Sequence, residues 1–476
     1  MKFISLPFFV FFVVVYGLYL LCNHRRQNRL LLVASYVFYG SWDWRFLVLI
    51  FASTVFNYFC GWKIDASANA KEKRAFLWLC VLANLTVLFF FKYYHFFIDG
   101  LSDLSSLAGI TLPMRFLEVV LPVGLSYYTF QAMSYSMDIY LRGLKPVRNF
   151  FDFSLFVSFF PNLLSGPIET ARHFLPQILS PRIVTLEKFY EGCYLIFWGI
   201  FQKAFVADNL LKIITPFFNS AAPYNGTQVL FSLYAVAIQV FCDFSGYTDI
   251  ARGLGKCMGF DLKLNFRLPY FVTNIADFWK RWHMSFYGWL KDYVYMPLVF
   301  RAKEKTEFVI YRSMFIIMVL AGLWHGSSVR FLLWGIYNGL LVVGYRLLQP
   351  ALRKIPLPRK PLLRDVWFVI RVILFFHLVC FGIILFKTKS VAQALQMLQA
   401  LFLNFSFDLS SAMMLYKVAF FCLPLLAIQL LQFSKDDLLA VLKINPWLRG
   451  LIYFYLFHLM MVFAFTGGNQ FIYFQF

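Results

Sequence analysis

The stretch MFIIMVLAGLWHGSSVRFLLWGIYNGLLVV occupies residues 314–343, and a few small and polar residues divide it into two apolar runs. Apolar runs of this kind are typical of membrane helices. Between them stands His325, where the chain is still expected to lie at membrane depth. An ionisable side chain is costly there and usually faces a polar cavity, so His325 is a candidate functional residue. The alternative is a histidine that only packs between helices.

The composition of the whole chain has the same character. Of its 476 residues, 61% are hydrophobic and 14% are charged, whereas soluble domains carry about 25% charged residues. The apolar runs are continuous and do not alternate, which favours helices over a transmembrane barrel. We therefore expect an all-α polytopic membrane protein with about 11–13 helices, including tilted, broken and re-entrant ones.

The net charge of +21 is not a signal for nucleic acid. The basic residues lie in short loops between apolar runs, which is the pattern of cytoplasmic loops. Such loops can also meet anionic headgroups, so membrane lipid is an expected partner.

Cysteine and histidine spacing argues against a metal centre. The eight cysteines include no Cys-x-x-Cys pair, and no His-Glu-x-x-His motif is present. We expect no bound metal and no bound cofactor.

Several segments interrupt the helical pattern. Two prolines and a glycine between Pro161 and Glu169 predict a re-entrant or interfacial turn. Residues 277–298 predict an amphipathic segment that carries a second histidine, His283. For this residue the alternative is a place in an interfacial helix, with its aromatic residues among the headgroups.

A basic, proline-containing stretch predicts the organisation of the chain. Residues 346–365 contain six arginines and lysines and four prolines, a composition that predicts an extended cytoplasmic linker. We therefore divide the chain into a core (1–345), the linker (346–365) and C-terminal transmembrane helices (366–476).

The two histidines suggest acyl transfer. Imidazole has a pKa near 6.5, which suits a general base at neutral pH. A site reached from both membrane faces would let a cytoplasmic thioester donate to a hydroxyl outside. Two other classes stay open: a transporter, to which broken helices also point, and a non-catalytic assembly subunit that docks a partner enzyme.

Several blocks of sequence together resemble the membrane-bound O-acyltransferase family, in the branch of the bacterial alginate O-acetylation proteins. The blocks are LLLVASYVFYGSW (30–42), LPVGLSYYTFQAMSYSMDIYLRG (121–143), FFPNLLSGPIETARHFLPQ (159–177), CDFSGYTDIARGLGKCMGF (242–260), NFRLPYFVTNIADFWKRWHMSFYGWLKDYVYMPL (265–298) and GLWHGSSVRFLLWGIYNG (322–339).

The resemblance implies tilted helices around a central funnel, and it implies roles for particular residues. The family's Trp-His-Gly histidine matches His325, and its Arg-Trp-His histidine matches His283, so both are catalytic candidates. We add five candidates for substrate binding, which are Trp324, Trp282, Asp243, Tyr247 and Asp249.

The resemblance also implies the reaction. An acetyl or other acyl group would move from a cytoplasmic thioester, acetyl-CoA or an acyl carrier protein, to an extracytoplasmic polysaccharide. The receiving hydroxyl can also belong to a partner transferase, such as an extracytoplasmic SGNH-like acetyltransferase. The implied location is the bacterial cytoplasmic (inner) membrane, with multiple passes. At residues 296–303 the chain departs from the alginate-type pattern, so teichoic acid (with D-alanine), peptidoglycan and cellulose stay open as acceptors.

Overall fold

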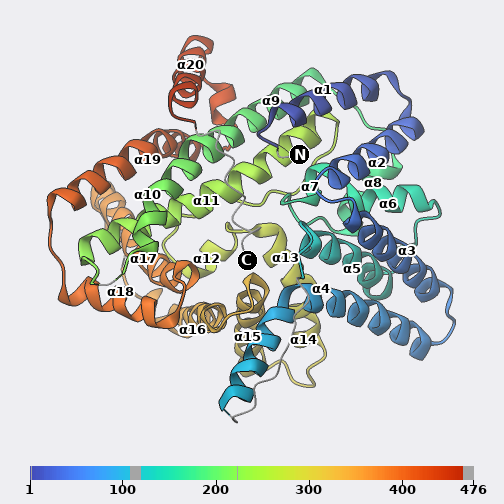
Figure 1. Cartoon of the computed structure of the whole chain (residues 1–476), viewed down its shortest axis with the longest axis horizontal. Coiled ribbons are helices and arrows are strands. Elements are labelled where there is room, and N and C mark those ends of the chain that lie inside the picture. The colour runs from blue at the N-terminus through green and yellow to red at the C-terminus, as the bar shows by residue number, and fades with distance from the viewer. Residues whose placement is uncertain (2, 108–118, 222, 357, 465–476) are drawn as a thin grey trace. The chain divides into compact units, whose positions relative to one another are not determined.

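The computed structural model of the chain consists of helices joined by non-helical connections (Figure 1). It describes residues 1, 3–107, 119–221, 223–356 and 358–464. Within these residues the chain has no β-strand. The predicted fold class, an all-α polytopic membrane protein, is therefore confirmed.

Eight of the described helices are long and apolar enough to cross a membrane. They are α3 (Arg45–Ala66), α4 (Ala70–Leu107, of which Ala70–Ile98 qualifies), α11 (Gly226–Cys257), α15 (Glu307–His325), α16 (Val329–Leu352), α17 (Pro361–Lys387), α19 (Leu409–Lys435) and α20 (Pro446–Phe463). Two shorter apolar helices are α1 (Leu6–Leu21) and α18 (Val391–Leu403).

The chain forms two compact units. The first contains residues 1–193 and 250–263, and the second contains residues 194–249 and 264–476. Besides α1, α3 and α4, the first unit has α2 (His24–Gly40), α5 (Leu125–Arg142), α6 (Phe150–Ser158), α7 (Phe160–Leu163) and α8 (Ala171–Leu179). Helices α9 (Leu186–Ile200) and α11 run from one unit into the other.

The first unit contains a buried, non-helical connection between α7 and α8. Gly166 belongs to it, and a Cβ at this position would lie 2.5 Å from the Asn162 Cα. The carboxylate of Glu169 accepts a hydrogen bond from the Lys263 backbone N–H (2.7 Å) and contacts His173 Nδ1 (2.6 Å). These contacts give the buried carboxylate polar partners. Helix α7 ends at Leu163 and α8 begins at Ala171, which confirms the predicted interruption of the helix between Pro161 and Glu169. Its re-entrant or interfacial character stays a prediction.

The second unit holds all seven residues predicted to act in function. After α9 the chain passes through a π-helical turn, η1 (Phe201–Ala207). The remaining elements of the unit are α10 (Asp208–Asn219), α12 (Ile275–Trp279), α13 (Met284–Leu290), η2 (Lys291–Tyr295), α14 (Met296–Phe300) and η3 (Ala440–Lys443), together with α11 and α15–α20.

Helices α15 and α16 form a tight hairpin within the second unit. Gly326 ends α15 in an extended conformation, and Ser328 caps α16 by accepting a hydrogen bond from the Arg330 N–H (3.3 Å). A Cβ on Gly322 would lie 2.9 Å from the Gly335 Cα. The two backbones therefore approach closely because both positions lack a side chain, as in other membrane helix pairs.

The segment between residues 273 and 300 is more broken than its sequence predicts. The pattern predicts one amphipathic segment over residues 277–298. Instead α12 ends at Trp279, a turn follows, and α13 begins after His283. The helix stops because His283 adopts a left-handed conformation (φ 46°), which a continuing right-handed helix cannot accommodate.

The predicted linker between residues 346 and 365 is partly helical. Helix α16 continues to Leu352 and α17 begins at Pro361. Of the predicted C-terminal region, residues 465–476 lie outside the described residues. The three-part division of the chain stays a prediction.

Candidate active site

The backbone holds His283 in an unusual position. It precedes α13 with φ 46° and ψ 47°, a left-handed conformation that is uncommon for residues other than glycine. Such conformations cost free energy and are found mainly where the surrounding structure enforces them, often at functional sites. Here the Met284 N–H donates to the Asn265 carbonyl oxygen (2.9 Å), which ties the start of α13 to the segment before α12.

The side chain of Asn265 determines which nitrogen of His283 carries a proton. The Ser285 backbone N–H donates to Asn265 Oδ1 (3.3 Å), and the Ser285 hydroxyl also donates to it (3.0 Å). Because an amide N–H can only donate, the atom that receives it is the oxygen. His283 Nδ1 lies 3.1 Å from the same oxygen, so it is the protonated nitrogen. Nε2 is then left with its lone pair.

His283 is a neutral, buried imidazole. Its side chain is 0% exposed, and burial lowers its pKa to about 3, because an apolar surrounding disfavours the charged form. The ring packs edge-on against Phe244 (centroid distance 4.6 Å) and lies 5.7 Å from the ring of Trp324. Nε2 has no hydrogen-bond partner among the described residues. A buried hydrogen-bond acceptor without a partner is suited to accept a hydrogen bond from a substrate.

His325 is the last residue of α15 and is surrounded by aromatic rings. It is 4% exposed. Its ring lies 4.9 Å from that of Trp324, 5.1 Å from Trp334 on α16 and 5.2 Å from Phe386 on α17. The indole of Trp324 therefore contacts both histidines. Two residues 42 positions apart in sequence are brought to one aromatic cluster.

A small cavity of about 50 Å³ borders His325. Its wall includes the predicted substrate-binding residue Trp282. The complete lining is Val240, Tyr270, Phe278, Trp279, Trp282, His325, Trp334, Asn338, Val379, Gly382, Ile383 and Phe386. The Tyr270 hydroxyl donates to the Ala237 carbonyl (2.7 Å), and the Asn338 amide donates to the Trp334 carbonyl (2.9 Å). With these donors engaged, the imidazole is the basic group in an otherwise largely apolar wall.

The acidic candidates lie in a different cluster of the second unit. Asp243 on α11 forms an ion pair with Lys203 (2.5 Å), and Lys203 forms a second one with Asp208 (2.8 Å). Burial opposes the charge of Lys203, but Asp243 and Asp208 outweigh it and raise the lysine's pKa. The Lys203 ammonium also lies 5.6 Å from the centre of the Tyr247 ring.

Asp249 lies beyond this ion-pair cluster on α11. Its carboxylate accepts hydrogen bonds from Gln202 Nε2 (3.0 Å) and from the Ser245 hydroxyl (3.5 Å). These contacts pair Asp243, Tyr247 and Asp249 with Lys203 and Gln202 of η1. None of the three α11 residues lines the His325 cavity. Phe244, the neighbour of Asp243, packs on His283, so α11 connects the ion pairs with the histidine.

Known proteins match this chain over most of its length. The family model of the membrane-bound O-acyltransferases matches residues 142–387, a region that includes both histidines and the cavity. The probable alginate O-acetylase of Pseudomonas aeruginosa is 37% identical over 396 residues, which is 83% of this chain and 73% of the relative.

This chain belongs to the membrane-bound O-acyltransferase family. It is also 30% identical to the peptidoglycan O-acetyltransferase of Helicobacter pylori over 83% of the chain and 79% of the relative. The teichoic acid D-alanyltransferase of Bacillus subtilis is 31% identical over 56% of the chain and 69% of the relative. The predicted family, and with it the class of O-acyltransferase enzymes, is confirmed.

Membership in the family leaves the roles of individual residues as predictions. Of the predicted set, His325 and Trp282 line the cavity. The ring of Trp324 contacts the rings of both histidines, and His283 does not line the cavity. The three α11 residues form a separate polar cluster.

Sequence reasoning missed several residues of this membrane-bound O-acyltransferase. Asn265 lies 18 positions before His283, and no spacing rule relates them. Trp334, Asn338 and Phe386 come from helices packed beside α15. Asn338 offered a signal, because a polar residue within an apolar membrane run requires a partner. Lys203 in η1 offered a similar signal, because its charge follows an apolar run.

Proposed function

We propose that this protein transfers a short acyl group, in the first place acetyl, from a cytoplasmic thioester to a hydroxyl on the outer side of the bacterial inner membrane. The observation that carries the proposal is the pair of buried histidines on either side of Trp324, with a small cavity against His325. The donor is acetyl-CoA or an acyl carrier protein. The acceptor hydroxyl belongs to a cell-surface polysaccharide or to an extracytoplasmic partner transferase.

The cavity supports a short acyl group. Its volume of about 50 Å³ is far below the roughly 300–1,000 Å³ of pockets for drug-sized ligands. The aromatic and aliphatic lining suits a methyl group. It also excludes water, which would otherwise hydrolyse the thioester.

The proposed reaction uses His325 as general base. Its imidazole takes the proton of the acceptor hydroxyl while the oxygen attacks the thioester carbonyl. The new C–O bond forms, the C–S bond breaks, and the thiolate recovers the proton from the imidazolium. His283 contributes its unprotonated Nε2, which accepts a hydrogen bond from a second donor group of the acceptor, outside the His325 cavity, and so positions the acceptor while His325 takes the proton of the attacking hydroxyl. Asn265 is a positioning residue because it sets the tautomer of His283.

The names of the relatives support a cell-surface polymer as the acceptor. One is a probable alginate O-acetylase, another a peptidoglycan O-acetyltransferase, and a third a teichoic acid D-alanyltransferase. All three names describe acyl transfer to a surface polymer. We infer an O-acetylated polysaccharide as the final product because acetyl transferases have the higher coverage among these three relatives.

The direct test is acetyl transfer in membranes from cells that carry His325→Ala. We expect the rate to fall by about 10²- to 10⁴-fold, the usual contribution of a general base. The matched control is His377→Ala, which removes another histidine of the second unit. Its ring contacts the Tyr234 hydroxyl (2.6 Å) and the Ile373 carbonyl (2.7 Å). Unchanged transfer by His325→Ala at normal protein abundance would refute the assignment.

The same variant distinguishes the proposed enzyme from the two rival functions. If the protein were only a scaffold, the variant would form less acetylated product only when it also failed to bind its partner. Co-purification of partner proteins is therefore measured together with the amount of acetylated product. A transporter would move substrate into liposomes without cleaving the thioester. Release of free thiol from the donor by the wild type, and its loss in His325→Ala, supports the enzyme.

A further inference from the structure

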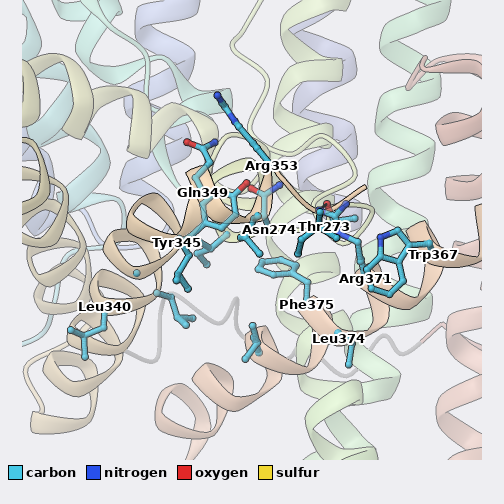
Figure 2. A pocket seen from close by; sticks show the side chains of 17 residues that line it. Thr273, Asn274, Leu340, Tyr345, Gln349, Arg353, Trp367, Arg371, Leu374 and Phe375 are labelled. Carbon is cyan, nitrogen blue, oxygen red and sulfur yellow. Dashed lines mark hydrogen bonds between the residues drawn. The ribbon is translucent and has the colours of Figure 1, made fainter. Parts of the chain in front are cut away.

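A large groove lies between α16 and α17 in the second unit, separate from the His325 cavity. Its volume is about 760 Å³. Figure 2 shows Gln349 and Arg353 toward one end of the groove, and Leu340 and Leu374 toward the other. A groove with a polar end and an apolar end is complementary to an amphipathic ligand.

The apolar end opens toward the surroundings of the two helices. Leu340 is 60% exposed and Leu374 is 61% exposed. Both α16 and α17 are candidate membrane spans. Side chains of this kind on a membrane helix face acyl chains, so a ligand of the groove has access from the bilayer.

Two arginines line the groove. Arg353 caps the end of α16, and Arg371 lies on α17 within the groove. Arg371 Nη2 donates to the Thr273 hydroxyl (3.0 Å), which holds the side chain in place. A guanidinium has five N–H donors, so this single bond leaves others for an anion. Paired N–H groups of this kind suit phosphate oxygens.

The surrounding charge indicates the leaflet. Besides Arg353, the connection to α17 and its first turn contain Lys354, Arg359, Lys360 and Arg364. Basic connections of this kind lie on the cytoplasmic side, where anionic lipids give the membrane a negative surface potential.

We propose that this groove binds an anionic phospholipid of the cytoplasmic leaflet. The phosphodiester lies between Arg353 and Arg371, and one acyl chain runs along Leu340, Gly344 and Leu374. Gly344 gives the chain room, because a Cβ at this position would meet no atom within 4 Å. The exposed leucines favour a lipid over a soluble phosphate.

One aromatic contact connects the lining of the groove with the lining of the His325 cavity. Phe375 lines the groove and packs against Phe278 (centroid distance 5.8 Å), and Phe278 lines the His325 cavity. Leu378 in the groove precedes Val379 in the cavity wall. The lipid therefore supports the helix pair that forms this wall, but its binding does not depend on the proposed acyl transfer.

The test is binding of phosphatidylglycerol to the purified full-length protein in phosphatidylcholine nanodiscs, followed by native mass spectrometry. We expect Arg353→Gln and Arg371→Gln each to weaken binding about five- to tenfold, the effect of one basic group near a membrane surface. The matched controls are Lys354→Gln and Arg364→Gln, which remove neighbouring charges that do not line the groove. Equal losses in the controls would mean diffuse attraction and would overturn the proposal.

A second variant tests the path of the acyl chain without a change of charge. Gly344→Leu places a side chain into the groove, and a Cβ at this position would meet no atom within 4 Å. We expect phosphatidylglycerol binding to fall while thermal stability in plain phosphatidylcholine is kept. Undiminished binding by Gly344→Leu would overturn the proposal, even if Arg371→Gln fails to fold.

A competition arm separates lipid from soluble phosphates. Glycerol 3-phosphate and coenzyme A are added at millimolar concentration to the wild-type nanodiscs. A lipid site keeps its phosphatidylglycerol under these conditions, because neither competitor supplies a chain for the leucines. If either compound displaces phosphatidylglycerol from the wild type but not from Arg353→Gln, the groove is a site for a soluble phosphate, and the proposal is overturned.

Discussion

His283 and His325 contact the same indole, but the protein holds them in different ways. His283 is fixed by a left-handed backbone and by Asn265, and it is fully buried. His325 ends a helix, is held by aromatic rings and forms part of a cavity wall. One imidazole is oriented by hydrogen bonds, whereas the other is placed by packing.

The difference suggests a division of labour. A residue whose tautomer and direction are set in advance is suited to orient a substrate, because no reorganisation is needed when the substrate binds. A residue beside a cavity is suited to exchange protons with the group that enters it. We therefore assign proton transfer to His325 and positioning to His283, and the following experiments test this division.

The largest effect is expected when both histidines are changed. His283→Asn is the suitable partner for His325→Ala, because asparagine tolerates the left-handed conformation. We expect each single variant to lower kcat/KM for acetyl transfer by about 10²- to 10⁴-fold. The double variant should be about as slow as the worse single one, since residues that act in one step are not additive. Multiplied losses in membranes with equal protein abundance would contradict a shared step.

The packing that places His325 can be disturbed from within its own helix, α15. Gly322→Val would push α15 away from α16, because a Cβ there already approaches the Gly335 Cα to 2.9 Å. We expect a loss of about 1–3 kcal/mol in stability, as for other overpacked interiors. Thermal unfolding in detergent measures it. Gly344→Ala on α16 is the control, and a similar loss in both variants would show that the glycine contact is unimportant.

The burial of His283 predicts a dependence of stability on pH. Its pKa is about 3 in the folded protein and about 6.5 in an unfolded chain. Between these values the unfolded state binds a proton that the folded state does not, so stability falls as the pH falls. One such group contributes a slope of up to about 1.4 kcal/mol per pH unit.

Thermal unfolding of the wild type and of His283→Asn between pH 7 and pH 4.5 tests this slope. The variant lacks the imidazole, and its stability should therefore fall less steeply as acid is added. His377→Ala serves as the reference for loss of a histidine elsewhere. Parallel curves for the wild type and His283→Asn would show that the imidazole is not buried as a neutral group.

Part of this architecture could be predicted from the sequence. The apolar runs predict the helices because each run must satisfy its own backbone in the membrane. His325 stands out because a charge-bearing side chain at that depth is rare. His283 and Trp324 followed from the family motifs. The left-handed backbone of His283 could not be predicted, since the surrounding residues read as one amphipathic segment.

The partners of the candidate residues could not be predicted either. Asp243 and Tyr247 carry polar groups near the end of an apolar run, so a role in substrate binding was a reasonable hypothesis. Their neighbour Lys203 comes from η1, and only the packing of η1 beside α11 pairs its charge with Asp243. The contact of Asn265 with His283 likewise could not be predicted, because the two residues come from separate segments. Spacing along the chain carries no information on contacts between separate elements.

The smallest predicted effect concerns the size of the cavity beside His325. Ile383 lines it, whereas its neighbour Ile384 on α17 does not. Ile383→Val removes one methylene from the wall, so a propionyl donor should fit better. We expect the ratio of propionyl to acetyl transfer to rise about tenfold, the usual lower limit for one methylene. Ile384→Val is the matched control, because it makes the same change away from the cavity. If both variants change the ratio equally, the cavity beside His325 does not hold the acyl group.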